Sequence, residues 1–143
     1  MRTVPSTELP GHLRLVIARM ARRLRQEAGG DLSPSLSSAL ASIDRHGPLT
    51  PSELAARERV QRPTITRILG RLEEAGLVER TADPTDRRSS LVAATAVGRA
   101  LMHEQRTRKD AFLARRLRAL SAEERATLDR AASILERMLG EAA

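Results

Sequence analysis

The sequence lacks several residue types, and each absence removes a class of function. Its 143 residues include no cysteine, tryptophan or tyrosine and a single phenylalanine. Without cysteine there can be no disulfide, thiol catalysis, thiol redox sensor or thiolate metal site. Because aromatic residues make up only 1%, the core must consist of Leu, Ile, Val, Ala and Met, and a pocket lined by aromatic rings is not expected.

Long apolar segments are also absent. The longest apolar runs, such as "LVIA" at residues 15–18, are far shorter than the roughly 20 residues that span a bilayer. Near the N-terminus arginines follow the apolar residues as well as precede them, which does not match a signal peptide. We therefore expect a cytoplasmic protein with no membrane partner, folded as a single domain over residues 1–143.

Lysine is nearly absent, because 24 of the 25 basic residues are arginine and Lys109 is the exception. The formal net charge is +7. Such an excess favours a polyanionic partner, although a GC-rich genome also produces arginine in place of lysine.

Start and stop signals divide the chain into helices and one hairpin. Ser33, Thr50, Thr95 and Ser121 each precede a segment with helical apolar spacing and are predicted N-caps; "TPSE" and "SAEE" are predicted capping boxes. Two short segments, "LVERTA" and "SLVAATA", are separated by a polar loop, as in a β-hairpin. The predicted helices cover residues 8–28, 33–46, 51–58, 63–75, 95–120 and 121–140.

The element order ααααββαα indicates a mainly α fold with a small β part (α+β) and fits a winged helix-turn-helix. That fold places the second helix of the pair, here residues 63–75, in the major groove of DNA. This helix has a polar, cationic face opposite an apolar one. The alternatives are a helix pair inside an ordinary bundle and a merely solvated cationic face. The apolar face consists of Ile65, Ile68, Leu69 and Leu72.

Residues 49–101, "LTPSELAARERVQRPTITRILGRLEEAGLVERTADPTDRRSSLVAATAVGRAL", resemble the DNA-binding lobe of the MarR (multiple antibiotic resistance regulator) family. The matching motifs are "RLEEAGLVER" and "DPTDRRSSLVAAT", and a looser resemblance covers about 11–140. It implies a homodimeric regulator, often a repressor released by a small molecule. The implied parts are a winged helix-turn-helix at 49–96 and dimerisation helices at 8–30 and 96–140. The cysteine of the peroxide-sensing branch and the tyrosines and tryptophans of many family ligand pockets are missing.

The outer face of residues 63–75 supplies the candidates for major-groove contacts. They are Arg62, Thr64, Thr66 and Arg67, with Gln61 at the helix entry.

The polar loop "DPTDRRSS", residues 83–90, supplies the wing candidates. In an extended strand Asp86 and Arg88 would lie on one side, so the carboxylate could hold the guanidinium in a fixed orientation for a narrow minor groove. The resemblance carries these roles onto Asp86 and Arg88, and Arg87 is expected to contact phosphate. The alternative is a polar turn with surface ion pairs that contribute little stability.

The last predicted helix carries an apolar stripe that we expect to pack against the first helix of a second subunit. An intramolecular core is the alternative. The expected dimer-interface residues are Val16, Met20, Leu128, Leu135 and Leu139.

An effector, if there is one, is expected to be a small amphipathic anion held by an arginine and aliphatic walls. His12, Arg14 and His46 are the candidate pocket residues. No metal or cofactor is expected, because the three histidines lack a ligand-spacing motif. No enzyme is expected either, since the two wing aspartates have no histidine or nucleophile beside them in a recognisable arrangement.

The sequence thus predicts a sequence-specific regulator that binds double-stranded DNA at a pseudopalindromic operator as a homodimer, and we expect it to act as a repressor. The rival hypothesis is a basic winged-helix interaction or architectural module without operator preference or ligand response.

Overall fold

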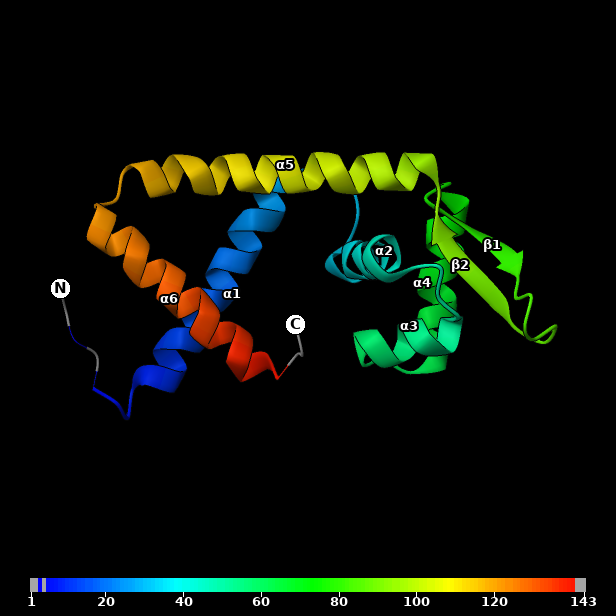
Figure 1. Ribbon diagram of the computed structural model, residues 1–143, viewed down its shortest axis with the longest axis horizontal. Helices are drawn as coiled ribbons and strands as arrows, with labels where there is room; N and C mark the ends of the chain where they lie inside the picture. Colours follow the sequence, from blue (N-terminus) through cyan, green and yellow to red (C-terminus); the bar gives the residue numbers. More distant parts are fainter. Residues whose placement is uncertain (1–2, 4, 141–143) are drawn as a thin grey trace.

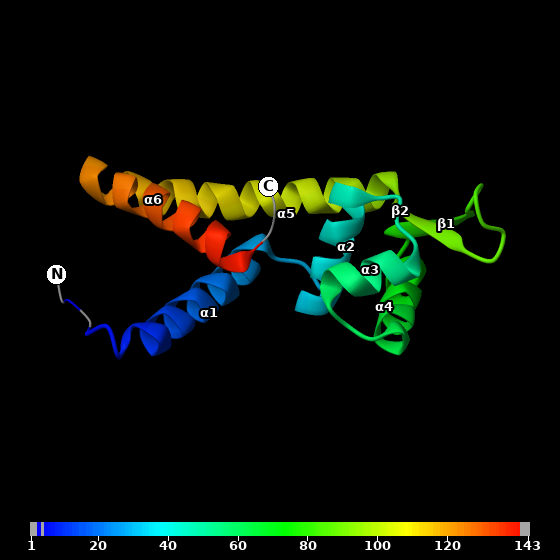
Figure 2. The ribbon, with the colours of Figure 1, turned by 60° about the horizontal axis from the view of Figure 1, so that its bottom comes forward.

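The computed structural model describes residues 3 and 5–140, and their arrangement confirms the predicted element order. One long helix, α5 (Ala96–Arg118), runs along the top of Figure 1. The first and last helices lie at one end of it, and the remaining elements lie at the other end in both ribbon views (Figures 1 and 2). The other bounds are α1 (Leu9–Ala28), α2 (Pro34–His46), α3 (Pro51–Glu58), α4 (Arg62–Glu74), β1 (Val78–Ala82), β2 (Ser90–Ala94) and α6 (Ala122–Leu139).

Polar caps fix where four of the helices begin. The hydroxyl oxygens of Ser33, Thr50, Thr95 and Ser121 each accept a hydrogen bond from the backbone N–H three residues on, as predicted. At Ser121 the cap N–H also donates to Glu124 at 3.0 Å, which completes the predicted capping box. At Thr50 the described bonds include only the first of the two, so that box is half formed. Each cap contributes about 1 kcal/mol to helix stability.

The buried core lies at the end of the molecule that carries α2, α3, α4 and the hairpin. The predicted apolar face of α4 is buried, since Ile65, Leu69 and Leu72 are fully covered. Helix α2 contributes Leu40 and so packs as part of the same core. Aliphatic side chains and Met102 fill this core, as the composition predicted. Its remaining members are Ala39, Ile43, Leu49, Leu54, Ala55, Ile68, Leu77, Val78, Val92 and Ala94.

The hairpin and its loop, residues 78–94, are called the wing below. Strands β1 and β2 pair antiparallel, with Val78 opposite Ala94 at the base. The segment before α3 joins this base: the N–H of Leu49 donates to the carbonyl of Val92 at 3.0 Å, and the N–H of Val92 donates back at 2.7 Å. The wing is therefore tied to the helix-turn-helix on the core side.

The first turn of α5 lies directly against the base of the wing. The N–H of Thr95 donates to the carbonyl oxygen of Leu77 at 3.0 Å. A Cβ atom at Gly98 would lie 2.1 Å from that same oxygen. Because backbone atoms cannot move aside as a flexible side chain can, only glycine fits at this contact.

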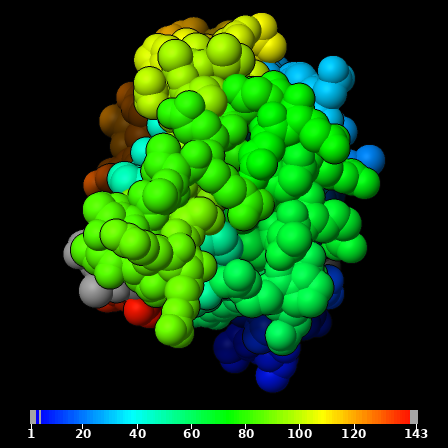
Figure 3. Space-filling model, turned by 90° about the vertical axis from the view of Figure 1, so that its right-hand side faces the viewer, coloured from blue at the N-terminus to red at the C-terminus, as the bar shows by residue number. Residues whose placement is uncertain are grey.

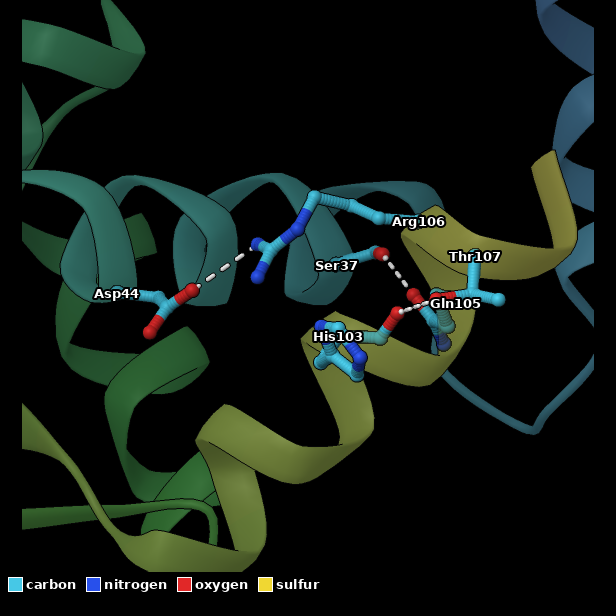
Figure 4. Close-up of polar contacts among 6 residues, drawn as sticks. All are labelled: Ser37, Asp44, His103, Gln105, Arg106 and Thr107. Carbon is cyan, nitrogen blue, oxygen red and sulfur yellow. Dashed lines mark hydrogen bonds and ion pairs between the residues drawn. The ribbon is translucent and has the colours of Figure 1, made fainter. Parts of the chain in front are cut away.

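Polar contacts hold α2 against α5 (Figure 4). The hydroxyl of Ser37 donates to Oε1 of Gln105 at 3.2 Å, and Gln105 is buried. The guanidinium of Arg106 donates to the carboxylate of Asp44 at 3.0 Å. The two contacts are about two helical turns apart along α2, so they fix its direction relative to α5.

The single phenylalanine, Phe112, is buried where α1 meets α5. The guanidinium carbons of Arg23 and Arg116 lie 5.2 Å and 5.1 Å from its ring centroid. Such cation–π contacts contribute about 0.5–1 kcal/mol each at exposed sites. Arg108 also donates to the carbonyl of Ala28 at 3.2 Å. Helix α1 is thus attached to α5 near its own C-terminal end.

Helices α1 and α6 with the adjoining half of α5 are called the stalk below. Helix α6 has no buried residue, and α1 buries only Ala28. Nine of their large apolar side chains are 42–67% exposed. Even so, none of the described helices combines the length and the apolar composition that crossing a bilayer requires. The exposed apolar residues are Leu9, Leu15, Val16, Ile17 and Met20 on α1, and Leu128, Ile134, Met138 and Leu139 on α6.

Candidate nucleic-acid interface

Helix α4 lies at the end of the molecule where the wing projects, and this end faces the viewer in Figure 3. Its outer face is polar and cationic. Arg62, Thr66 and Arg67 are exposed, on the side opposite the buried apolar face. Gln61 is exposed at the N-cap, and its side chain makes no cap bond. Pro63 occupies the first turn, where its missing N–H costs nothing. Four of the five sequence candidates therefore share one accessible surface.

Two hydrogen bonds organise this surface. The guanidinium of Arg62 donates to the hydroxyl oxygen of Ser52 on α3. The hydroxyl of Thr66 donates to the carbonyl of Arg62 at 3.0 Å. The Thr66 proton is thus used within the helix, while its methyl group and oxygen lone pairs stay available for a base edge. Ser52 was not among the sequence candidates.

The fifth candidate, Thr64, is half-buried and lies on a different side of α4. It lines a groove of about 200 Å³ between the start of α2 and α4. Arg67 lies on the same groove, so this arginine borders both surfaces. We call it the α2–α4 groove; its lining residues are Ser33, Ser35, Leu36, Thr64, Arg67, Ile68 and Arg71.

The wing tip is a turn, so the prediction of an extended strand there is wrong. Strand β1 ends at Ala82, and the N–H of Ser89 donates to the carbonyl of Asp86 at 3.1 Å, which closes a tight turn. Oδ1 of Asp86 accepts the backbone N–H of Arg88 at 3.0 Å. No ion pair joins Asp86 to Arg88 within the described part of the chain. The short aspartate side chain reaches the backbone two residues on, so the carboxylate shapes the turn rather than holding the guanidinium.

A second aspartate folds the other half of the loop. Oδ1 of Asp83 accepts the backbone N–H of Thr85 at 2.9 Å and its hydroxyl at 2.8 Å. These two hydrogen bonds lower the pKa of the Asp83 carboxyl below its ordinary value of 3.8. The sequence did contain this signal, since "DPT" is typical of a turn closed by an aspartate side chain. Two consecutive aspartate turns thus hold the loop, and both Arg87 and Arg88 are exposed at its tip.

An ion pair connects α4 to the wing. The guanidinium of Arg80 on β1 donates to the carboxylate of Glu73 near the end of α4, and both side chains are 37% exposed. The two residues are seven positions apart across a turn, so no periodicity of helix or strand predicted the contact. It restrains the wing relative to α4.

The excess positive charge does not lie on the lobe that carries this interface. Residues 29–95 contain nine arginines and nine carboxylates, so the whole net charge of +7 comes from the two ends of the chain. The interface is cationic because of where individual arginines point. The composition favoured a polyanionic partner because of the total charge of the chain. The fold places that excess charge outside the candidate interface.

The structure does not bring the three predicted ligand residues together within one chain. His12 and Arg14 are exposed on α1, whereas His46 lies at the end of α2. His46 borders an open hollow of about 590 Å³, together with Arg57 and Arg59 of the helix-turn-helix. Basic residues at helix C-termini are favoured by the helix dipole, which accounts for this grouping. Among the described residues no three His, Asp or Glu side chains cluster closely enough to hold a metal ion.

The predicted dimer residues all lie on the stalk. Val16 and Met20 on α1, and Leu128 and Leu139 on α6, are among its exposed apolar side chains. Leu135 is half-buried. The alternative of an intramolecular core for the α6 stripe is not found, because α6 buries no residue within the described chain.

Residues 32–90 match the MarR family. A helix-turn-helix-type transcriptional regulator of Mycobacterium tuberculosis is 35% identical over 134 residues, covering 93% of this chain and 94% of that protein. The transcriptional repressor MdtR of Bacillus subtilis is 34% identical over 93 residues, covering 65% and 60%. A solved transcriptional regulator protein of Pseudomonas aeruginosa PA01 superimposes with a TM-score of 0.84 at 36% identity, covering 99% of this chain and 100% of that one. The chain belongs to the MarR family of helix-turn-helix transcriptional regulators.

Proposed function

We propose that the protein is a homodimeric repressor that binds a pseudopalindromic operator in double-stranded DNA and is released by a small amphipathic anion. The observation that carries the proposal is the exposed apolar surface of α1 and α6, at the opposite end of the molecule from α4 and the wing. One end supplies the dimer contact, and the other end supplies the DNA contact.

The stalk has the properties of a surface covered by a second copy. Single exposed apolar residues are ordinary, but a concentration of them on two helices marks an interaction surface. Charge favours pairing of α1 with the partner's α6: residues 9–28 hold five arginines and one glutamate, whereas residues 122–139 hold four carboxylates and three arginines. A two-fold dimer then presents two α4 helices, which requires an inverted-repeat operator with half-sites about 34 Å apart.

Repression is the mode that the comparisons favour. MdtR of Bacillus subtilis is named a transcriptional repressor. A dimer that covers two successive major grooves with α4 and the flanking minor grooves with its wings would exclude other proteins from that stretch of DNA. We therefore propose that the protein acts on promoter DNA. We also propose that it does so in the cytoplasm.

The α2–α4 groove is the best supported effector site. It combines the guanidinium groups of Arg67 and Arg71 with the aliphatic side chains of Leu36 and Ile68. A carboxylate can pair with the arginines while the hydrocarbon part of the same molecule contacts the aliphatic wall. Since Arg67 is also a candidate DNA contact, a bound anion would withdraw it from the DNA. The pocket residues predicted from the sequence remain a prediction, because they could form one site only across two subunits. They are His12, Arg14 and His46.

The rival function, a basic winged-helix module without operator preference, differs in one measurable property. Wild-type protein is incubated with a random pool of DNA duplexes, and bound sequences are recovered over successive rounds. We expect an inverted repeat to emerge, to bind in the presence of excess competitor DNA, and to be occupied by a dimer in sedimentation. Recovery of unrelated sequences with equal affinity would favour the rival function.

A further inference from the structure

We propose that Ser52 is a specificity-determining positioning residue, which holds the guanidinium of Arg62 for contact with a base edge in the major groove. The inference rests on the proposed sequence-specific DNA binding. Arg62 is the first residue of α4, and Ser52 is the second residue of α3. Across the turn between these helices, the Arg62 guanidinium donates to the Ser52 hydroxyl oxygen.

The partner of Arg62 differs in kind from the partners of the arginines in the ion pairs. The ion pairs of the described chain join arginines to carboxylates, as in Arg80 with Glu73 and Arg106 with Asp44. Arg62 takes part in none of these pairs, and its partner is a neutral hydroxyl. A carboxylate neutralises the arginine that it holds, whereas a hydroxyl fixes its direction and leaves the full positive charge. The contact with Ser52 therefore orients the Arg62 guanidinium without neutralising its charge.

The free donors of Arg62 suit a base contact. A guanidinium carries five N–H donors, and the bond to Ser52 uses one of them. The remainder suffices for a bidentate contact with O6 and N7 of guanine, the commonest specific arginine contact in the major groove. An arginine also loses side-chain freedom when it binds, and an anchor that orients it beforehand removes part of that loss.

The position of Arg62 favours a base edge over a phosphate. In a helix-turn-helix, the N-terminal residues of the second helix reach base edges, while the first helix crosses the DNA backbone. Arg62 begins that second helix, and Thr66, one turn further on, is exposed on the same outer face. Ser52 thus fastens an arginine of the groove-entering helix to the helix that crosses the backbone.

The experiment uses three substitutions at one position, in the full-length protein. Ser52→Ala removes the acceptor, Ser52→Thr keeps a hydroxyl, and Ser52→Asp replaces it with a carboxylate. Each variant is measured against the operator selected by wild type, the same operator with single guanines replaced, and a scrambled duplex, at three salt concentrations. Ser38→Ala, an exposed serine on α2, is the matched control and should behave as wild type. Melting temperatures exclude a folding defect.

Ser52→Ala should reduce the ratio of operator to scrambled-site affinity about three- to tenfold, a part of the roughly 5- to 150-fold that one bidentate contact supplies. The loss should concentrate at one guanine, and Ser52→Thr should restore the ratio. Ser52→Asp should weaken binding to every duplex and reduce the slope of log affinity against log salt by about 1 per subunit, because the arginine charge is neutralised. On an Arg62→Ala background, Ser52→Ala should have no further effect.

Three results separate this inference from the proposed function. A wild type that selects no sequence defeats the proposed function, and the inference fails with it. A selective wild type with an unchanged specificity ratio in Ser52→Ala overturns the inference alone. Equal weakening of operator and scrambled duplex also overturns it, because that pattern belongs to a phosphate contact.

Discussion

Replacing Asp86 with alanine removes the acceptor that holds the backbone N–H of Arg88 at 3.0 Å in the wing turn. The turn remains closed by the bond between Ser89 and the Asp86 carbonyl, so the loop should loosen without unfolding. Arg87 and Arg88 would then sample more directions before they meet DNA. We expect weaker operator binding with little change in melting temperature.

The magnitude follows from the single bond that is lost. One hydrogen bond at an exposed site contributes about 1 kcal/mol, which is about a fivefold change in the population of the ordered turn. A two-fold dimer uses two wings, so the loss in operator affinity should be at most about 25-fold. Removal of two carboxylates near the DNA phosphates offsets part of this, by less than about 1 kcal/mol per site.

Asparagine at position 86 provides the decisive comparison. Its amide oxygen can accept the same backbone bond, but it carries no charge. If Asp86 acts on the backbone, Asp86→Asn should bind the operator as tightly as wild type or more tightly, because a repulsive charge is gone. Asp110→Asn, an exposed position on α5, makes the same change of charge outside the wing and should leave affinity within about twofold.

The assay is fluorescence anisotropy of a labelled operator at one fixed salt concentration, combined with amide hydrogen exchange at Arg88. Faster exchange and weaker binding are expected together in Asp86→Ala, and neither in Asp86→Asn. If asparagine weakens binding as much as alanine does, the carboxylate charge is what matters. The role of Asp86 as a backbone acceptor would then be refuted. The result would instead favour the prediction that its carboxylate holds the Arg88 guanidinium.

Three further perturbations test other parts of the molecule. Leu135→Arg should bury an unpaired charge in the dimer contact at a cost of about 3–5 kcal/mol, so sedimentation should show monomers and operator binding should be lost; a variant that remains a tight dimer contradicts the stalk assignment. Arg67→Ala should relax base preference about 5- to 150-fold, whereas Arg88→Ala should weaken most duplexes alike, and wild-type affinity in Arg88→Ala would count against the wing. Gly98→Ala, with a carbonyl oxygen 2.1 Å from the new Cβ, should destabilise the fold by about 2 kcal/mol or more, while Gly70→Ala, with open space around it, should stabilise it by up to about 1 kcal/mol; equal thermal melts would refute the packing argument.

The features that the sequence predicted well are those determined by neighbours along the chain. Ser121 and Glu124 are three residues apart, so their reciprocal cap depends only on local geometry. The burial of Ile65 and Leu69 follows in the same way from helical periodicity, because one face of α4 must cover the core. Element order and the caps of four helices were therefore predictable before any tertiary contact was known.

The features that the sequence did not predict depend on how separate elements meet. Arg62 reaches Ser52 only because the turn between α3 and α4 brings the two helix starts together. The error at Asp86 has a different origin: alternation of side chains was assumed for a segment where an aspartate next to polar residues favours a turn. Thr64 shares its helix with Arg67, yet α2 covers part of its surface.

The separation of charge between the neutral lobe of residues 29–95 and the basic stalk has a consequence for association with DNA. The arginines at the end of α5, residues 115–118, lie about 30 Å along the helix from the base of the wing. At physiological ionic strength the Debye length is about 8 Å, so their field is largely screened from a DNA duplex at the other end. At about 0.01 M it is about 30 Å, and the whole charge of the protein then contributes to attraction. The rate of encounter with DNA should therefore fall steeply with added salt and level off near physiological strength, where the few arginines of α4 and the wing alone guide the approach.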